Sequence, residues 1–227
     1  YTLTKTVNPA AGGTVSASPA PDCGSGTGYS AGTAVTLTAS ANAEYAFGSW
    51  SGCDSSTGLT CQVTMNSNRT VTANFTVINP LVNPGFESGR GVAWAEYSKA
   101  GFPIVGTTRP HTGAYSAYFC EYSSCTEYIQ QKVTIPSGAS SLSYWRYMSS
   151  VDSTTTAYDL LAVRMYSSSG VLLTTLRTWS NTSTRNTWLK DTLNISAYKG
   201  QTIYLVFIAT TNATNATAFF VDDVSIQ

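Results

Sequence analysis

Two short strings that lie far apart in the sequence hold the carboxylates best suited to bind a cation. The first reads NPGFESG over residues 83–89, and the second reads VDDVSI over residues 221–226. Carboxylate and carbonyl oxygens are the hard ligands that Ca²⁺ prefers, and an aspartate inside an apolar strand is costly unless something pairs with it. The strings predict one domain whose ends meet at a structural calcium ion. The alternative is a solvated strand edge at Asp222 and Asp223, with Glu87 an ordinary loop carboxylate.

Length and charge narrow the class of protein. The 227 residues are enough for one large all-β domain or for two small domains, and we favour two. Only 11% of the residues are charged and the net charge is zero, so no basic stripe exists to bind nucleic acid. The longest apolar run, residues 203–209, is far shorter than the roughly 20 residues that cross a bilayer. We expect a soluble chain without membrane insertion.

The cysteine pattern indicates an oxidising setting. Four of the five cysteines form closely spaced pairs: Cys53 with Cys61, and Cys120 with Cys125. No CxxC string occurs and His111 is the only histidine, so zinc is disfavoured and two local disulfides are expected. Disulfides favour an extracellular location. Cys23 is left over, and it could be free, replace one partner of the first pair, or join two chains.

Short β-branched runs separated by Gly, Pro, Asn and Ser predict strands throughout, with no helical period. In the first third of the chain the expected strands are residues 2–7, 13–17, 34–39, 62–65 and 70–75. Pro80 and Pro84 interrupt any ladder. We therefore predict a first domain over residues 1–76, a linker over 77–80 and a second domain over 81–227.

The first domain resembles the InlB B-repeat-like bacterial repeat. The resemblance is carried by YTLT at residue 1, GGTV at 12, GTAVTLTA at 32, WSGC at 50 and VTANF at 71. It implies a spacer or adhesive β module of β-grasp character without catalysis. Relatives often pair a cysteine near Cys23 with another a few residues later, and here that partner is absent.

The second domain carries strand candidates at residues 115–119, 127–135, 141–148, 159–166, 171–178, 188–194, 202–209 and 218–226, which predict a two-sheet jelly roll. The order of NPGFESG, Trp94, RPHTG at residue 109, SAYKGQT at 196 and VDDVS at 221 resembles the galactose-binding-like carbohydrate-binding modules of secreted bacterial enzymes. In that family a structural Ca²⁺ ties the first loop to the last strand. The resemblance implies these ligands: Asn83, Gly85, Glu87, Ser116, Asp222 and Asp223.

Strand alternation adds two expectations for this domain. Phe220, Asp222, Val224 and Ile226 should share one face, so that Asp222 points inward as the better ligand. On the outer faces, aromatic rings and a guanidinium could form a sugar-binding platform: Trp145, Tyr147, Arg164 and Tyr166. The alternative is that these aromatic side chains merely cover a sheet or pack on the other domain.

The loop between Cys120 and Cys125 is a second candidate for sugar recognition. A short disulfide loop lowers the ordering cost of binding, and this one would present Glu121 and Tyr122, with Trp94 and Tyr97 beside it. The alternative is a clip that only holds a hairpin.

Catalytic motifs are missing from the sequence. His111 lies in a turn, the remaining acids are scattered, and no GxSxG, HExxH or phosphate loop occurs. We therefore expect a non-catalytic, secreted bacterial module that binds polysaccharide or a cell-surface glycan and anchors a larger protein, with a linked upstream catalytic domain as a further partner. The alternatives are an adhesin segment or assembly subunit, and the protein-binding domain of a secreted peptidase.

Overall fold

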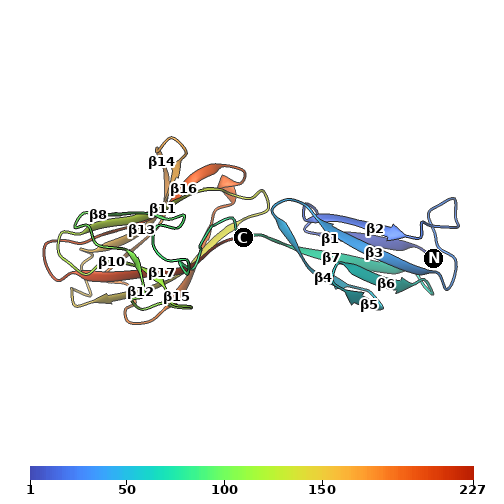
Figure 1. Cartoon of the computed structure of the whole chain (residues 1–227), viewed down its shortest axis with the longest axis horizontal. Coiled ribbons are helices and arrows are strands. Elements are labelled where there is room, and N and C mark those ends of the chain that lie inside the picture. Colours follow the sequence, from blue (N-terminus) through green and yellow to red (C-terminus); the bar gives the residue numbers. More distant parts are fainter. The chain divides into compact units, whose positions relative to one another are not determined.

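The computed structural model describes all 227 residues, and they are almost entirely strands and connecting loops. A single 3₁₀ turn, η1 (Ser196–Tyr198), is the exception, and no helix is long and apolar enough to span a membrane. The chain divides into two compact units, Tyr1–Ile78 and Asn79–Gln227, so the division lies inside the segment predicted as a linker. The expected all-β class is confirmed (Figure 1).

The first unit contains two sheets with strand orders β1-β7-β4 and β2-β3-β6-β5. Its strands are β1 (Leu3–Asn8), β2 (Gly13–Ser18), β3 (Ala34–Ala41), β4 (Tyr45–Ser51), β5 (Ser55–Thr57), β6 (Thr60–Thr64) and β7 (Arg69–Val77). β1 pairs with β7 in parallel, and every other pair in this unit is antiparallel. No helix packs on these sheets, so the expected β-grasp character is wrong.

β-branched and aromatic side chains on alternating positions fill the core of the first unit. Leu37 and Val63 are almost fully buried between the sheets, which is the environment that period-2 sequences favour. The predicted Cys53–Cys61 disulfide is present. Cys23 is exposed and free, so it does not replace a partner of the first pair, and the alternative that it joins two chains stays open.

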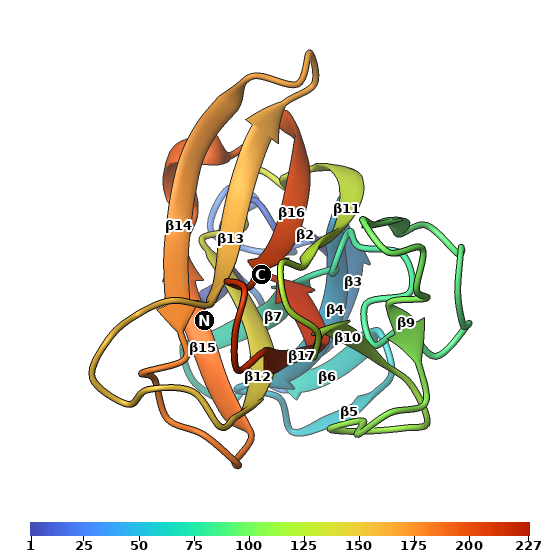
Figure 2. The same ribbon diagram turned by 90° about the vertical axis from the view of Figure 1, so that its left-hand side faces the viewer.

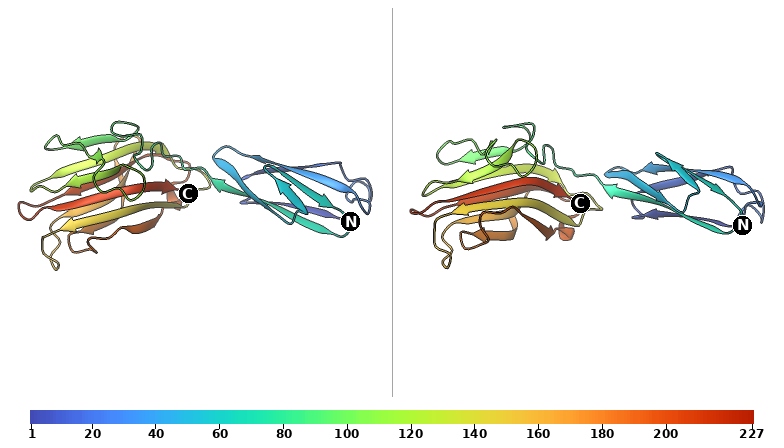
Figure 3. Two further views of the ribbon diagram at one scale, coloured as in Figure 1. Left: turned by 60° about the horizontal axis from the view of Figure 1, so that its bottom comes forward. Right: turned by 90° about the horizontal axis from the view of Figure 1, so that it is seen from below.

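The second unit is a sandwich of two five-stranded antiparallel sheets (Figure 2). The first sheet has the order β15-β12-β17-β10-β9, and the second has β14-β13-β16-β11-β8. The strands are β8 (Ala95–Ser98), β9 (Val105–Gly106), β10 (Ser116–Cys120), β11 (Thr126–Thr134), β12 (Ser141–Ser150), β13 (Leu160–Ser167), β14 (Leu172–Ser180), β15 (Leu189–Asn194), β16 (Thr202–Thr210) and β17 (Thr217–Ile226). Figure 3 shows β17 lying beside β12 in the first sheet. The expected two-sheet sandwich is confirmed.

Large aromatic side chains fill the space between the two sheets. Phe207 is fully buried, and its ring packs at a tilt against Trp94 at a centroid distance of 6.3 Å and edge-on against Tyr144 at 5.1 Å. The Trp94 ring also packs on Phe86, and its Nε1 donates to the carbonyl of Asn83 at 3.0 Å. Trp94 is only 2% exposed, so it is a core residue and its expected role as a sugar contact is wrong.

We predict that Phe207→Ala destabilises the second unit by about 3–5 kcal/mol, because the lost ring leaves a cavity that Trp94 and Tyr144 line. Denaturant unfolding followed by tryptophan fluorescence measures the loss. Val171→Ala is the matched control, since Val171 is 62% exposed and should change stability by less than about 0.5 kcal/mol. Equal effects of the two substitutions would contradict this description of the core.

Candidate functional site

The carboxylate of Glu87 binds the backbone of a loop that follows β9. Its Oε2 accepts a hydrogen bond from the N–H of Ala114 at 2.8 Å, and its Oε1 accepts one from the N–H of Tyr115 at 3.1 Å. Gly113 lies so close to this carboxylate that a Cβ there would overlap it, and its φ is +64°. Glycine is therefore required where the loop passes over Glu87.

The two aspartates of β17 hold the preceding part of the same loop. Asp222 is fully buried, and its Oδ2 accepts from the backbone N–H of His111 at 2.8 Å and of Thr112 at 3.3 Å. Asp223 contacts Nδ1 of His111 at 2.7 Å and accepts from the hydroxyl of Thr112 at 2.7 Å. Glu87, Asp222 and Asp223 thus hold residues 111–115, and we call this arrangement the carboxylate clasp.

A bulge overturns the expected direction of Asp222. The β12–β17 register shifts between Ser143 and Trp145, and Asp223 adopts a φ of 48°. Trp145 therefore faces Asp222 on the outer side of the sheet, while Val224 and Ile226 point into the core. The prediction that all four alternating residues of β17 share one face is wrong, because the bulge reverses the alternation.

The clasp concentrates negative charge around one backbone position. A Cβ built on Gly85 would lie 3.4 Å from Oδ1 of Asp223, and 3.9 Å from both Oδ1 of Asp222 and Cγ of Glu87. Burial raises the pKa of Asp222 to about 6, even though backbone N–H groups bonded to it lower that pKa. The imidazole of His111 is the only basic group paired with these carboxylates.

Two residues of the expected metal set have other partners. The carbonyl of Asn83 accepts from Trp94 and from the N–H of Phe86, and its side-chain oxygen accepts from the N–H of Ser88. The hydroxyl of Ser116 donates to the carbonyl of Thr108 at 2.7 Å. Glu87, Asp222 and Asp223 also accept hydrogen bonds, so these contacts exclude none of the six residues, and the calcium set stays a prediction.

The expected platform of four residues is divided between the two sheets. Trp145 and Tyr147 belong to β12, whereas Arg164 and Tyr166 belong to β13 in the opposite sheet. The four side chains cannot contact one ligand ring together. The prediction of a joint platform is therefore wrong, because strands that are neighbours in sequence here lie in different sheets.

The outer face around β12 is covered. The His111 ring stacks on Trp145 at a centroid distance of 3.9 Å, and the Arg109 guanidinium lies 4.4 Å from the centre of the Tyr147 ring. Trp188 packs against Tyr147 at 5.7 Å, and Tyr147 is only 8% exposed. Trp145, which is half-buried, and Tyr147 therefore pack against the clasped loop and its flank instead of forming an uncovered platform.

The outer face of the other sheet is open and lined by tyrosines. Strand register sets the side chains in three rows: Lys132, Tyr204 and Tyr166 in the first; Gln130, Val206 and Arg164 in the second; Tyr97, Tyr128, Ile208 and Ala162 in the third. Between the first and third rows the surface is hollowed into a groove of about 380 Å³. Its lining consists of Tyr128, Gln130, Tyr166, Gly170, Tyr204, Val206 and Ile208. We call this the tyrosine groove.

The floor and walls of the tyrosine groove have distinct chemistry. Val206 is 5% exposed and forms an apolar floor. The Tyr128 ring is stacked on Tyr97, with centroids 5.0 Å apart and planes 17° apart, so that its orientation is fixed. Gln130 supplies an amide beside the floor. Four residues along a strand span about 14 Å, which separates the aromatic rows of Tyr128 and Tyr204 and makes the groove elongated.

Three of the eight residues expected to bind ligand lie at this groove: Tyr166 lines it, Arg164 lies beside Val206 of its floor, and Tyr97 stacks on Tyr128 at its edge. Tyr128, Gln130 and Tyr204 were missed. The signal was present, because these residues occupy the polar-facing positions of two alternating strands. These side chains lie side by side only because β11 pairs with β16. The sequence of neither strand alone predicts that pairing.

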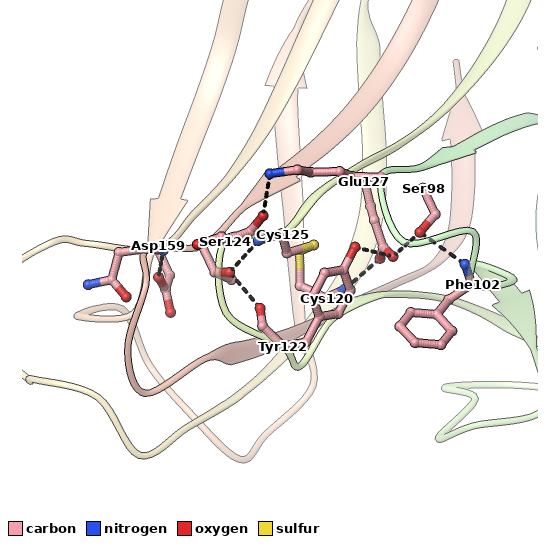
Figure 4. The surroundings of a disulfide bond; sticks show 11 residues. Ser98, Phe102, Cys120, Tyr122, Ser124, Cys125, Glu127 and Asp159 are labelled. Carbon is pink, nitrogen blue, oxygen red and sulfur yellow. Dashed lines mark hydrogen bonds between the residues drawn. A yellow bond between two sulfur atoms is a disulfide. The ribbon is translucent and has the colours of Figure 1, made fainter.

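The disulfide loop forms a separate surface (Figure 4). The predicted Cys120–Cys125 bond is present. Tyr122 packs edge-on against Phe102 at 5.4 Å and donates to Glu127 at 3.1 Å, and the exposed Glu121 accepts from the Tyr118 hydroxyl. Glu121 and Tyr122 line a pocket of about 440 Å³. Tyr97 does not line it and contacts the tyrosine groove instead.

Ligand atoms of Cys120, Cys125 and Glu127 lie within 4.8 Å of one another. Both sulfurs are in the disulfide, so neither is a thiolate that could bind a metal. The carboxylate of Glu127 accepts from the Ser98 hydroxyl at 2.6 Å and from the N–H of Cys120 at 2.6 Å. This group is a structural anchor for the loop.

Comparison with known proteins confirms the resemblance expected for the first domain. The family model for the divergent InlB B-repeat domain matches residues 1–79. No curated protein matches the chain.

Carbohydrate-binding modules with a β-sandwich fold are among the structures similar to this chain. TmCBM61 in complex with beta-1,4-galactotriose is 19% identical, with 66% of this chain and 98% of that chain covered and a TM-score of 0.48. Family 16 Carbohydrate Binding Module-2 is 18% identical over 66% and 99% of the two chains, with a TM-score of 0.44. The K3 cleaved adhesin domain of Lys-gingipain from Porphyromonas gingivalis is 16% identical over 65% and 98%, with a TM-score of 0.48.

We predict that Gly113→Ala destabilises the second unit by more than Gly170→Ala does. Both glycines have a positive φ, of +64° and +84°, but a Cβ at Gly170 would meet no atom within 4 Å, whereas one at Gly113 would overlap Glu87. The backbone cost alone is about 1–2 kcal/mol, and displacing Glu87 adds the loss of its two hydrogen bonds to the N–H groups of Ala114 and Tyr115. Thermal unfolding of both variants measures the difference. Equal losses would show that the clasp contributes nothing to stability.

Proposed function

We propose that the second unit is a non-catalytic module that binds polysaccharide in the tyrosine groove. The observation that carries this proposal is an elongated, open groove in which tyrosine rings lie at both ends of an apolar floor, with an amide beside it. The apolar C–H faces of sugar rings pack on aromatic rings, and a few placed polar groups hold the hydroxyls. An extended chain of sugars matches this layout better than a single compact ligand does.

The fixed orientation of the rings favours binding. Tyr128 is held by its stack on Tyr97, so less side-chain freedom is lost when a ligand packs on it. Each rotamer-rich side chain that a ligand must immobilise costs about 0.5–1.5 kcal/mol. A groove built on strands therefore retains more of the contact energy than a flexible loop would.

Replacing the groove tyrosines tests the proposal. We expect Tyr128→Ala and Tyr204→Ala each to weaken binding about tenfold, which corresponds to about 1.4 kcal/mol, because each removes one stacking face. Isothermal titration and affinity electrophoresis against a panel of neutral and acidic polysaccharides measure the affinity. Tyr158→Ala is the matched control, since Tyr158 is 49% exposed and lies outside the groove. Binding by none of the panel, or no effect of either groove variant, would refute the proposal.

We further propose that the carboxylate clasp holds a structural Ca²⁺. The donors at hand, Glu87, Asp222 and Asp223, are all oxygens, and they surround the same backbone position at Gly85. The raised pKa of Asp222 indicates that burial of its charge is incompletely compensated, and a divalent cation would supply the missing charge. The ion would fix the clasped loop and has no part in sugar recognition.

Metal removal tests the calcium proposal. We expect Ca²⁺ at a hundredfold excess over Kd to stabilise the unit by about 2.7 kcal/mol, and EDTA to reverse this. Asp222→Asn should abolish the response, whereas Asp54→Asn should retain it, because Asp54 lies in the first unit and contacts Arg69 and the N–H of Thr64 there. A melting temperature that neither Ca²⁺ nor EDTA changes would contradict the proposal.

The two disulfides and the glycan-binding groove fit a secreted module that anchors a larger protein on its substrate. Local disulfides persist in oxidising compartments, and the first unit, a β-repeat, would act as its spacer.

A further inference from the structure

The charges beside the tyrosine groove are all of one sign. Apart from tyrosines, the strands of this sheet carry two ionisable side chains on its outer face, and these are Lys132 of β11 and Arg164 of β13. The acids of its strands, Glu96 and Glu127, occupy the opposite positions, and Glu127 is 2% exposed. Arg177 lies across from Val163, a core residue, and so does not face the groove.

Neither cation has a carboxylate partner. The ion pairs of the protein are Arg69–Asp54, Arg90–Glu96, His111–Asp223 and Arg146–Asp191. The ammonium of Lys132 lies 5.9 Å from the centre of the Tyr204 ring. The guanidinium of Arg164 has only a long contact of 3.5 Å with the Tyr166 hydroxyl, and its Nε is buried without an acceptor. A partly buried guanidinium without an anion is destabilising, so an anion brought by a ligand would be favourable here.

The two cations lie on opposite sides of the groove. Tyr204 pairs with Lys132 on one side and with Tyr166 on the other, and Val206 pairs with Arg164. β11 and β13 both neighbour β16, so they lie about 10 Å apart across it. A negatively charged chain lying along β16 would therefore pass between Lys132 and Arg164 while packing on Tyr204.

We propose that the polysaccharide bound in the tyrosine groove is acidic, with uronic acid units whose carboxylates pair with Arg164 and Lys132. The inference rests on the proposed function and names its substrate class. The planar guanidinium matches a carboxylate through two parallel hydrogen bonds, and the absence of acids on this face removes the repulsion that would exclude such a chain.

Binding to matched polysaccharides tests the substrate class. Polygalacturonate and alginate are compared with neutral galactan and with a sulfated polysaccharide by isothermal titration at low and high salt. We expect the uronates to bind at least about tenfold more tightly than galactan at low salt, and the preference to shrink as salt screens the charges. Arg164→Gln should remove most of the preference and Lys132→Gln part of it. Arg164→Lys should retain part, and Lys5→Gln in β1 of the first unit should have no effect.

The outcomes separate this inference from the function on which it rests. Tighter binding of uronates that depends on both Tyr128 and Arg164 supports it. Equal binding of galactan and uronates that depends on Tyr128 but not on Arg164 overturns the acidic substrate and leaves the groove as a glycan site. A preference for the sulfated chain overturns the assignment to carboxylates. Binding by none of the four overturns both proposals, and unchanged melting of Arg164→Gln ensures that a loss is not unfolding.

Discussion

The carboxylate clasp decides which outer face of the sandwich is covered by a loop and which face stays accessible to a ligand. By holding residues 111–115 through backbone N–H groups, Glu87 and Asp222 keep the loop against β12. His111 then stacks on Trp145 and closes the outer face of that sheet. No such loop covers the tyrosines of the opposite sheet, so the fold leaves one aromatic face open and one closed. Asp222 is the buried member of the clasp, and a buried carboxylate stabilises a fold only when hydrogen-bond partners satisfy it.

The fold was largely predictable from the sequence, because period-2 alternation and turn residues are local signals. The strands that were missed show the limits of these signals. β4 contains Gly48 at a register shift, β8 has four residues and β9 has two. Segments this short or interrupted bury too little apolar surface to produce a recognisable pattern, and they form because neighbouring strands supply hydrogen-bond partners.

The candidate sites were predictable only in part, because they depend on pairing between distant segments. Both disulfides were foreseen, since their cysteines are neighbours in sequence. The direction of Asp222 was not, because the bulge at Asp223 reverses the alternation. The joint platform of Trp145 with Arg164 failed for a related reason: adjacent strands of a sandwich often belong to different sheets, and alternation within a strand does not say which sheet it joins.

The tip of the β13–β14 hairpin lies beside the tyrosine groove, and its sequence can vary without disturbing the core of the sandwich. Gly170 lines one end of the groove, and a side chain added there would meet no neighbour within 4 Å. Val171 beside it is exposed, so the tip carries none of the core. Insertions at such a tip and substitutions at Val171 alter local shape at little cost in stability, whereas a side chain at Gly170 also carries the cost of its positive φ. Natural variation at these few positions could therefore lengthen, narrow or cap the groove, and so diversify ligand range while the sandwich stays constant.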